Sequence, residues 1–145
     1  MPPSPHAVRF VEHFTAAWRE QTDEAFFAVW EEALHPDVRL VQPMVPPTSG
    51  LAAFREEFGR LRALIPDLGA EVQRWAASGD TVFIEFTLSG TLAGEAVRWD
   101  VVDRMLLDAQ GLCVERVAYF DSAQLFPTLL RHPTVWPQAI RGLKG

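Results

Sequence analysis

The sequence has only one cysteine, Cys113, among its 145 residues. A disulfide within the chain needs two cysteines, and a single cysteine offers no metal-binding cluster. The sequence also has no basic run. Its 13 lysines and arginines stand against 19 acidic residues, and the formal charge is -6. We therefore expect no nucleic-acid partner, no binding to an anionic membrane surface and no metal site.

Long apolar runs are absent as well. No segment approaches the roughly 18 uninterrupted apolar residues that a membrane-spanning helix needs. The N-terminal segment "MPPSPHAVRF" lacks the basic region and the following apolar stretch of a secretory signal. We expect a soluble, unsecreted protein that resides in the reducing cytoplasm.

The residues that are present suffice for a substantial core, since 48% are hydrophobic and 11% are aromatic. This length and composition predict one domain over residues 1–145, with extended tails at 1–6 and 131–145. Neither a repeat nor a low-complexity segment divides the chain.

Apolar residues recur at helical spacing in three segments of the first half, at residues 6–21, 24–34 and 51–65. Thr22 or Asp23 can cap the second of these helices, and Thr48 or Ser49 the third. Between them, "VRLVQPM" is interrupted by a proline and is typical of a brief or edge strand.

From Gly69 onward the apolar period changes to two, which predicts strands. Turn sequences at "SGD", "LAG" and "DAQG" divide this region into four strands joined by hairpins. Helices followed by an antiparallel meander indicate an α+β fold, in which three helices pack on one face of a curved, mostly antiparallel sheet. Such a half-barrel is cone-shaped and can enclose a ligand cavity between the sheet and the helices.

One aspartate interrupts the apolar face of the strand expected over residues 95–107. Alternate residues of this strand form the inward-facing series Val97, Trp99, Val101, Asp103, Met105 and Leu107. An unpaired carboxylate there would be poorly solvated, so its pKa would rise and suit it to proton donation. The alternative is a structural ion pair, which requires the next strand to turn Arg116 inward.

Several segments in this order resemble one superfamily: "LHPDVRLVQPM", "VVDRMLLDAQG" and "VERVAYFDSAQLF". They are similar to nuclear transport factor 2-like proteins, most of all to the SnoaL-like branch, which includes polyketide cyclases and is related to ketosteroid isomerases and limonene epoxide hydrolases. The resemblance covers residues 6–130. It implies a conical α+β barrel, dimerisation through the outer face of the sheet and a cavity for small apolar molecules.

The resemblance also implies roles for individual residues. Asp103 falls where ketosteroid isomerases carry the protonated aspartic acid of their oxyanion hole. Gln42 stands where those isomerases have their general base, and Phe14 where they have a tyrosine. The "RWD" at residues 98–100 has the letters of the epoxide hydrolase motif but lies one strand late, and Ala118 occupies the last-strand acid position of the cyclases.

These observations favour a small cofactor-independent enzyme that acts by acid/base chemistry on an apolar carbonyl- or phenol-bearing molecule, as a cyclase, isomerase or dehydratase. Asp103 and Arg116 are the candidate catalytic residues. The candidate substrate-binding residues are Phe14, Trp18, Gln42, Met44, Phe58, Phe86, Trp99 and Phe120. The alternative is a non-catalytic homodimer that binds an apolar small molecule, and a third possibility is an assembly subunit that uses an exposed sheet face with Phe83 and Tyr119.

Overall fold

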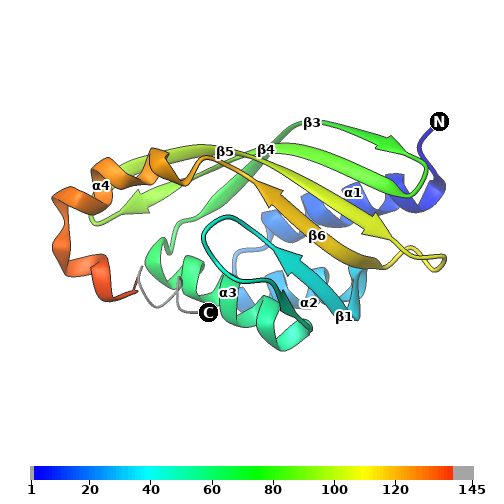
Figure 1. The fold of residues 1–145 in the computed structure, drawn as a ribbon, viewed down its shortest axis with the longest axis horizontal. Helices are drawn as coiled ribbons and strands as arrows, with labels where there is room; N and C mark the ends of the chain where they lie inside the picture. The colour runs from blue at the N-terminus through cyan, green and yellow to red at the C-terminus, as the bar shows by residue number, and fades with distance from the viewer. Residues whose placement is uncertain (1, 139–145) are drawn as a thin grey trace.

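Three helices from the N-terminal half cover one face of a six-stranded sheet in the computed structural model, which describes residues 2–138 (Figure 1). The helices are α1 (Pro5–Arg19), α2 (Asp23–Ala33), α3 (Leu51–Leu64) and α4 (Phe126–Arg131), with 3-10 turns η1 (Ser122–Leu125) and η2 (Pro133–Val135). The strands are β1 (Leu34–Val41), β2 (Thr48–Ser49), β3 (Gly69–Ser78), β4 (Thr81–Leu92), β5 (Glu95–Leu107) and β6 (Cys113–Tyr119). The expected α+β half-barrel is confirmed. No helix within residues 2–138 is both long and apolar enough to cross a membrane.

The strands follow the order β2-β1-β6-β5-β4-β3, and all neighbours are antiparallel except β1 and β6. The expectation of a brief or edge strand at "VRLVQPM" is wrong, because β1 has eight residues and lies between β2 and β6. Its pairing with β6 is irregular between Leu34 and Arg39, where Pro36 offers no N–H. Pro43 lies beyond the end of the strand and therefore breaks no pairing.

Helix α2 begins as expected, since the Thr22 hydroxyl accepts a hydrogen bond from the Ala25 N–H. The cap expected for α3 is wrong. Gly50 is the N-cap there, with a φ of +100° that favours glycine and with no side-chain hydrogen bond. Thr48 and Ser49 instead pair with β1 as strand β2, which leaves the Thr48 hydroxyl free for a different contact.

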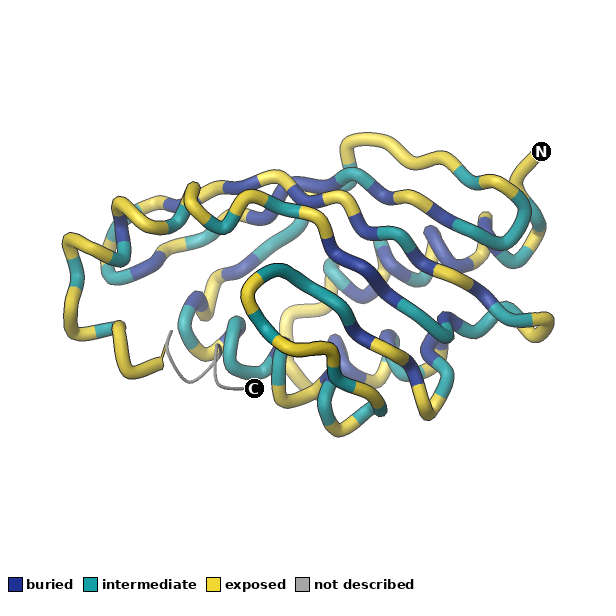
Figure 2. Tube along the Cα trace, in the orientation of Figure 1, coloured by how far each residue is buried: buried dark blue, intermediate teal, exposed yellow. Residues whose placement is uncertain are grey.

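Burial alternates along the central strands, as the period of two predicts (Figure 2). On β5 the whole inward-facing series from Val97 to Leu107 is buried, including Asp103. The largest fully buried side chains are mostly aromatic, and edge-to-face contacts link Phe14 to Trp30 and to Phe86. The core therefore lies between the inner sheet face and helices α1, α2 and α3.

Within residues 2–138, parts of the expected extended tails are helical. Helix α1 already begins at Pro5, with the Ser4 hydroxyl accepting from the Ala7 N–H, and residues 133–135 form η2. The Asp121 side chain caps η1 by accepting a hydrogen bond from the Ala123 N–H. The rest of the C-terminal tail, residues 139–145, lies outside the described residues.

Candidate active site

A cavity of about 250 Å³ lies between the inner face of the sheet and the helices. Apolar and aromatic side chains make up most of its lining. All ten residues that the sequence analysis selected line it: Phe14, Trp18, Gln42, Met44, Phe58, Phe86, Trp99, Asp103, Arg116 and Phe120. Sequence reasoning therefore located the residues, and their roles stay predictions.

An ion pair occupies the sheet side of this cavity. Asp103 of β5 lies opposite Ala118 of β6, and Met105 lies opposite Arg116, so Asp103 and Arg116 are diagonal neighbours on the inner face. Arg116 Nε donates to Asp103 Oδ2 at 2.9 Å, and Arg116 Nη2 donates to Oδ1 at 3.0 Å. The aspartate on the apolar face is thus one half of a two-point ion pair.

Both partners are almost fully buried, with exposed side-chain fractions of 1% for Asp103 and 6% for Arg116. Loss of hydration raises the pKa of Asp103, while the charge and the hydrogen bonds of Arg116 oppose that rise without cancelling it. Burial likewise raises the pKa of the nearby Cys113 thiol to about 12, so this cysteine is protonated and unreactive at neutral pH.

Arg116 keeps one hydrogen-bond donor unused. Its guanidinium lies 5.0 Å from the centre of the Phe58 ring, and Nη1 is buried without a hydrogen-bond partner among residues 2–138. The indole Nε1 groups of Trp18 and Trp30 are also buried without a partner in the same part of the chain. All three side chains line the cavity, and all three groups can only donate.

A second carboxylate lines the cavity, and the sequence analysis did not select it. Glu57 Oε1 accepts a hydrogen bond of 2.6 Å from the Thr48 hydroxyl. Gln42 Nε2 donates to Glu57 Oε2 over 3.5 Å. Glu57 borders the apolar stripe of α3, since it lies three residues after Phe54 and four before Leu61, and that spacing was the signal that could have found it.

The carboxylate of the "RWD" segment lies outside the cavity. Asp100 is exposed on the outer face of the sheet and accepts a 2.7 Å hydrogen bond from the Thr87 hydroxyl. Ala118 leaves the position opposite Asp103 without a carboxyl group.

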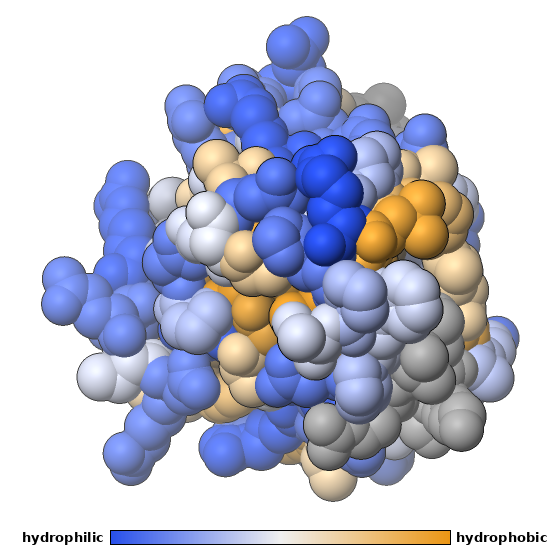
Figure 3. All heavy atoms as spheres, turned by 90° about the vertical axis from the view of Figure 1, so that its left-hand side faces the viewer, coloured by the Kyte–Doolittle hydropathy of each residue, from blue (hydrophilic) through white to orange (hydrophobic). Residues whose placement is uncertain are grey.

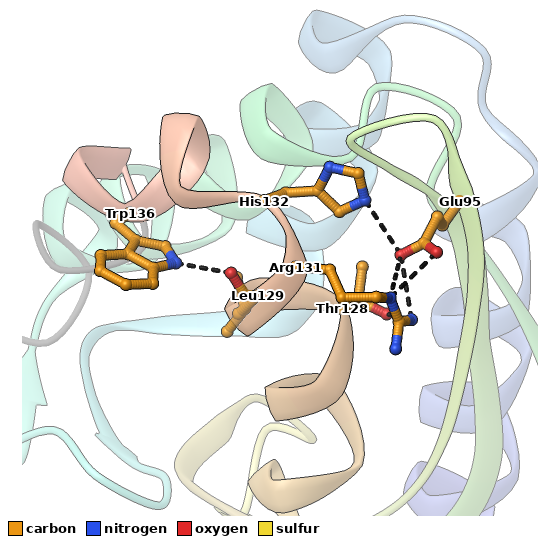
Figure 4. A network of polar contacts seen from close by, with 6 residues as sticks. All are labelled: Glu95, Thr128, Leu129, Arg131, His132 and Trp136. Carbon is orange, nitrogen blue, oxygen red and sulfur yellow. Dashed lines mark hydrogen bonds and ion pairs between the residues drawn. The ribbon is translucent and has the colours of Figure 1, made fainter.

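The C-terminal segment lines one part of the cavity with side chains that were not predicted from the sequence: Leu125, Phe126 and Leu129. Figure 3 views this end of the molecule and shows apolar residues recessed among hydrophilic ones. Arg131 and His132 both contact Glu95 at the β4–β5 turn, as Figure 4 shows, and the Trp136 indole donates to the Leu129 carbonyl. The Arg131 hydrogen bonds lower the pKa of Glu95.

A mostly antiparallel sheet that curves over helices around an internal cavity is the nuclear transport factor 2-like fold. Within this fold class, residues 11–116 match the SnoaL-like domain, and the chain belongs to that family. The resemblance inferred from the sequence is therefore confirmed. No curated protein matches the chain.

Solved structures of the same fold share little sequence with this protein. A candidate SnoaL-like polyketide cyclase from Jannaschia sp. CCS1 is 20% identical, with a TM-score of 0.74 over 85% of this chain and 92% of its own. TerC, crystallised with polyporic acid, is 20% identical, with a TM-score of 0.71 over 88% and 99% of the two chains. An LEH-like epoxide hydrolase from M. tuberculosis is 23% identical, with a TM-score of 0.64 over 90% and 93%. At these identities the likeness shows the fold alone.

Residues 2–138 contain no group of three or more metal-binding side chains. The polar groups that line the cavity include the ion pair, the two indole N–H groups and Glu57, and Arg60, Ser122 and Gln138 line it as well. The Arg116 and indole donors can bind a ligand oxygen, and the Glu57 carboxylate can receive a proton.

Proposed function

We propose that this protein is a small enzyme that binds an apolar carbonyl- or phenol-bearing molecule and acts on it by acid/base chemistry without a cofactor, in a cyclisation, isomerisation or dehydration. The supporting observation is the buried Arg116 Nη1, a charged donor without a partner in residues 2–138, beside an apolar cavity. A buried donor without an acceptor destabilises a protein, and a ligand oxygen would satisfy it.

In this proposal Asp103 is a positioning residue. Both of its oxygens accept from Arg116, so the carboxylate fixes the plane of the guanidinium and directs Nη1 to the ligand. The role of proton donor that the sequence favoured for Asp103 is therefore not the one we propose. Gln42 orients Glu57 by donating to its Oε2, and the aromatic residues exclude water from the bound molecule.

Matched ligands test the proposal. Trp18, Trp30 and Trp99 line the cavity, so their fluorescence should report binding of β-tetralone, an apolar ketone, and of tetralin, its hydrocarbon counterpart. We expect the ketone to bind more tightly, by about 10- to 100-fold, because a hydrogen bond from a charged donor contributes roughly 1.5–3 kcal/mol. Polyporic acid, the compound crystallised with TerC, is a second oxygen-rich probe.

Arg116→Lys should remove most of this preference. Lysine keeps the positive charge beside Asp103 but lacks the planar set of donors that lets arginine bind two partners at once. Arg104→Lys, on the outer face of the same strands, is the matched control and should bind as the wild type does. Equal affinity of the wild type for the ketone and the hydrocarbon would contradict the proposal.

A non-catalytic binding protein is the second candidate, and one observation favours it: the Asp103 carboxylate is fully engaged by Arg116, which removes the acid that the sequence suggested as a reagent. Ligand binding without turnover across a ketone and phenol panel would support this candidate.

We also propose that the protein is a homodimer that pairs through the outer sheet face, where Phe83, Val102, Leu106 and Tyr119 are exposed. Sedimentation of the wild type and of Val102→Glu would test the pairing, since a charge within the buried contact should shift the protein to monomer.

A further inference from the structure

A general base needs a carboxylate that is not committed to a cation. Asp103 lines the cavity, but each of its oxygens accepts a charge-assisted hydrogen bond from Arg116, at 2.9 and 3.0 Å, so taking up a proton there would disrupt the ion pair that positions Arg116. The cavity nevertheless contains a second carboxylate, Glu57, on helix α3. This group comes from a different layer of the fold from the ion pair.

The contacts of Glu57 hold it in place and leave capacity on one oxygen. Oε1 accepts a 2.6 Å hydrogen bond from Thr48, whereas among residues 2–138 the hydrogen bond found for Oε2 is the 3.5 Å contact with Gln42. Each carboxylate oxygen can accept about two hydrogen bonds, so Oε2 can still receive a proton. Gln42 cannot take up a proton usefully, and its amide serves to orient Glu57.

We propose that Glu57 is the general base of this cavity, and the proposal rests on the proposed function. Glu57 Oε2 removes a proton from the carbon next to a ketone whose oxygen is bound by Arg116 Nη1. The C–H bond breaks and an O–H bond forms on Oε2; the C–H electron pair becomes the π bond of the new C=C bond, and the π pair of the C=O bond moves onto the ketone oxygen. The resulting enolate oxygen stays hydrogen-bonded to Arg116, and return of the proton to the same or another carbon regenerates the carboxylate.

This arrangement defines the substrate class further. The molecule has an acceptor oxygen, because the unused groups of Arg116, Trp18 and Trp30 can only donate. It also has an acidic C–H near that oxygen, because Glu57 needs a proton to remove. An enolisable apolar ketone, flanked by rings such as Phe86 and Trp99, meets both conditions.

Proton exchange in deuterated buffer tests Glu57 without knowledge of the natural substrate. Wild-type protein should accelerate replacement of the enolisable C–H of β-tetralone by C–D, followed by proton nuclear magnetic resonance. Glu57→Gln should slow this catalysed exchange about 100-fold or more, because a general base typically contributes at least that factor. The same variant should leave the Kd for β-tetralone unchanged, because the amide occupies the same space.

Two further variants distinguish the base from a structural role. Glu56→Gln removes the neighbouring exposed carboxylate, which pairs with Arg60 and does not line the cavity, and should exchange as the wild type does. Glu57→Asp keeps a carboxylate on a shorter side chain and should restore part of the exchange that Glu57→Gln loses. A folded Glu57→Gln protein with wild-type exchange would overturn the inference.

The binding data separate failure of this inference from failure of the proposed function. If the wild type prefers β-tetralone to tetralin but does not accelerate exchange, Glu57 is not a general base and the oxygen-binding site stands. If the wild type shows no preference for the ketone, the proposed function fails and the role of Glu57 is overturned with it.

Discussion

Two arginine–carboxylate pairs join β5 to β6, one on each face of the sheet. Asp103 and Arg116 pair on the inner face, while Arg104 and Glu115, their neighbours in sequence, pair on the outer face at 3.3 Å. The period of two in a strand places these adjacent residues on opposite sides. The inner side chains are 1% and 6% exposed, and the outer ones are 39% and 30% exposed.

The difference shows that burial, and not the kind of residue, decides what such a pair does. Water solvates the outer charges and screens their attraction, so that pair contributes little to folding. The inner pair has lost its hydration, which is costly for both charges and makes each depend on the other. Among residues 2–138 the inner arginine, which lines the cavity, also retains a buried donor without a partner, whereas solvent can satisfy the outer arginine of a single chain.

Removing the inner arginine should have the largest effect on stability. Arg116→Met leaves Asp103 buried without its cation, and breaking a buried pair in this way costs about 3–5 kcal/mol. Denaturant titration at neutral pH measures the free energy of unfolding. Arg104→Met, the matched change on the outer face, should cost less than about 1 kcal/mol at a protein concentration low enough to keep the chain monomeric, because a dimer through the outer face would bury Arg104. Equal losses for the two variants would show that burial does not distinguish the pairs.

Asp103→Asn should change the free energy of unfolding less than Arg116→Met does, and the direction in which this change varies with pH can be predicted. Burial raises the pKa of Asp103 in the folded state above its unfolded value, so the folded protein binds the proton more tightly. The stabilising contribution of Asp103 is complete at a pH below its pKa in the unfolded chain. It is lost as the pH rises through its pKa in the folded protein. The asparagine variant lacks this titration and should gain stability relative to the wild type as pH rises, by about 1.4 kcal/mol for each unit of pKa shift.

Unfolding titrations of both proteins from acidic to neutral pH provide this comparison. Carboxylates with a lowered pKa, such as Glu31, Asp67 and Glu95, lose their contribution as pH falls, but they are common to both proteins and cancel in the difference. If the variant instead loses stability relative to the wild type as pH rises, the attraction of Arg116 outweighs the burial of Asp103.

The inner pair could be predicted from the sequence because the alternation of side chains along a strand is a local signal. The apolar residues around Asp103 fixed its face, and the same alternation on the next strand turned Arg116 inward once the register was given. The register itself depends on the "DAQG" hairpin, whose turn and following bulge the sequence only partly specifies.

Glu57 was harder to predict from the sequence because its partners, Gln42 and Thr48, lie between the end of β1 and the start of α3. The hydrogen bonds from Gln42 and Thr48 form only because residues 42–50 bring β2 beside helix α3. The C-terminal lining was missed for a similar reason, since the segment is held by Glu95, 36 residues before Arg131 in the sequence. Neither contact produces a periodic pattern in the chain.

The smallest expected effect belongs to the outer pair. Glu115→Gln removes the ion pairs with Arg104 and Arg39 and should still change the free energy of unfolding by less than about 1 kcal/mol, and the difference should shrink further as salt is added, because partly exposed charges are screened. The corresponding inner difference, between Asp103→Asn and the wild type, should depend much less on salt, since buried groups are poorly screened. Both are measured by denaturant titration at low and high ionic strength and at two protein concentrations, because a dimer formed through the outer face would bury Glu115. The difference in free energy of unfolding between Glu115→Gln and the wild type could instead stay the same at high salt and low protein concentration. That result would mean that exposure on the sheet surface does not weaken this pair.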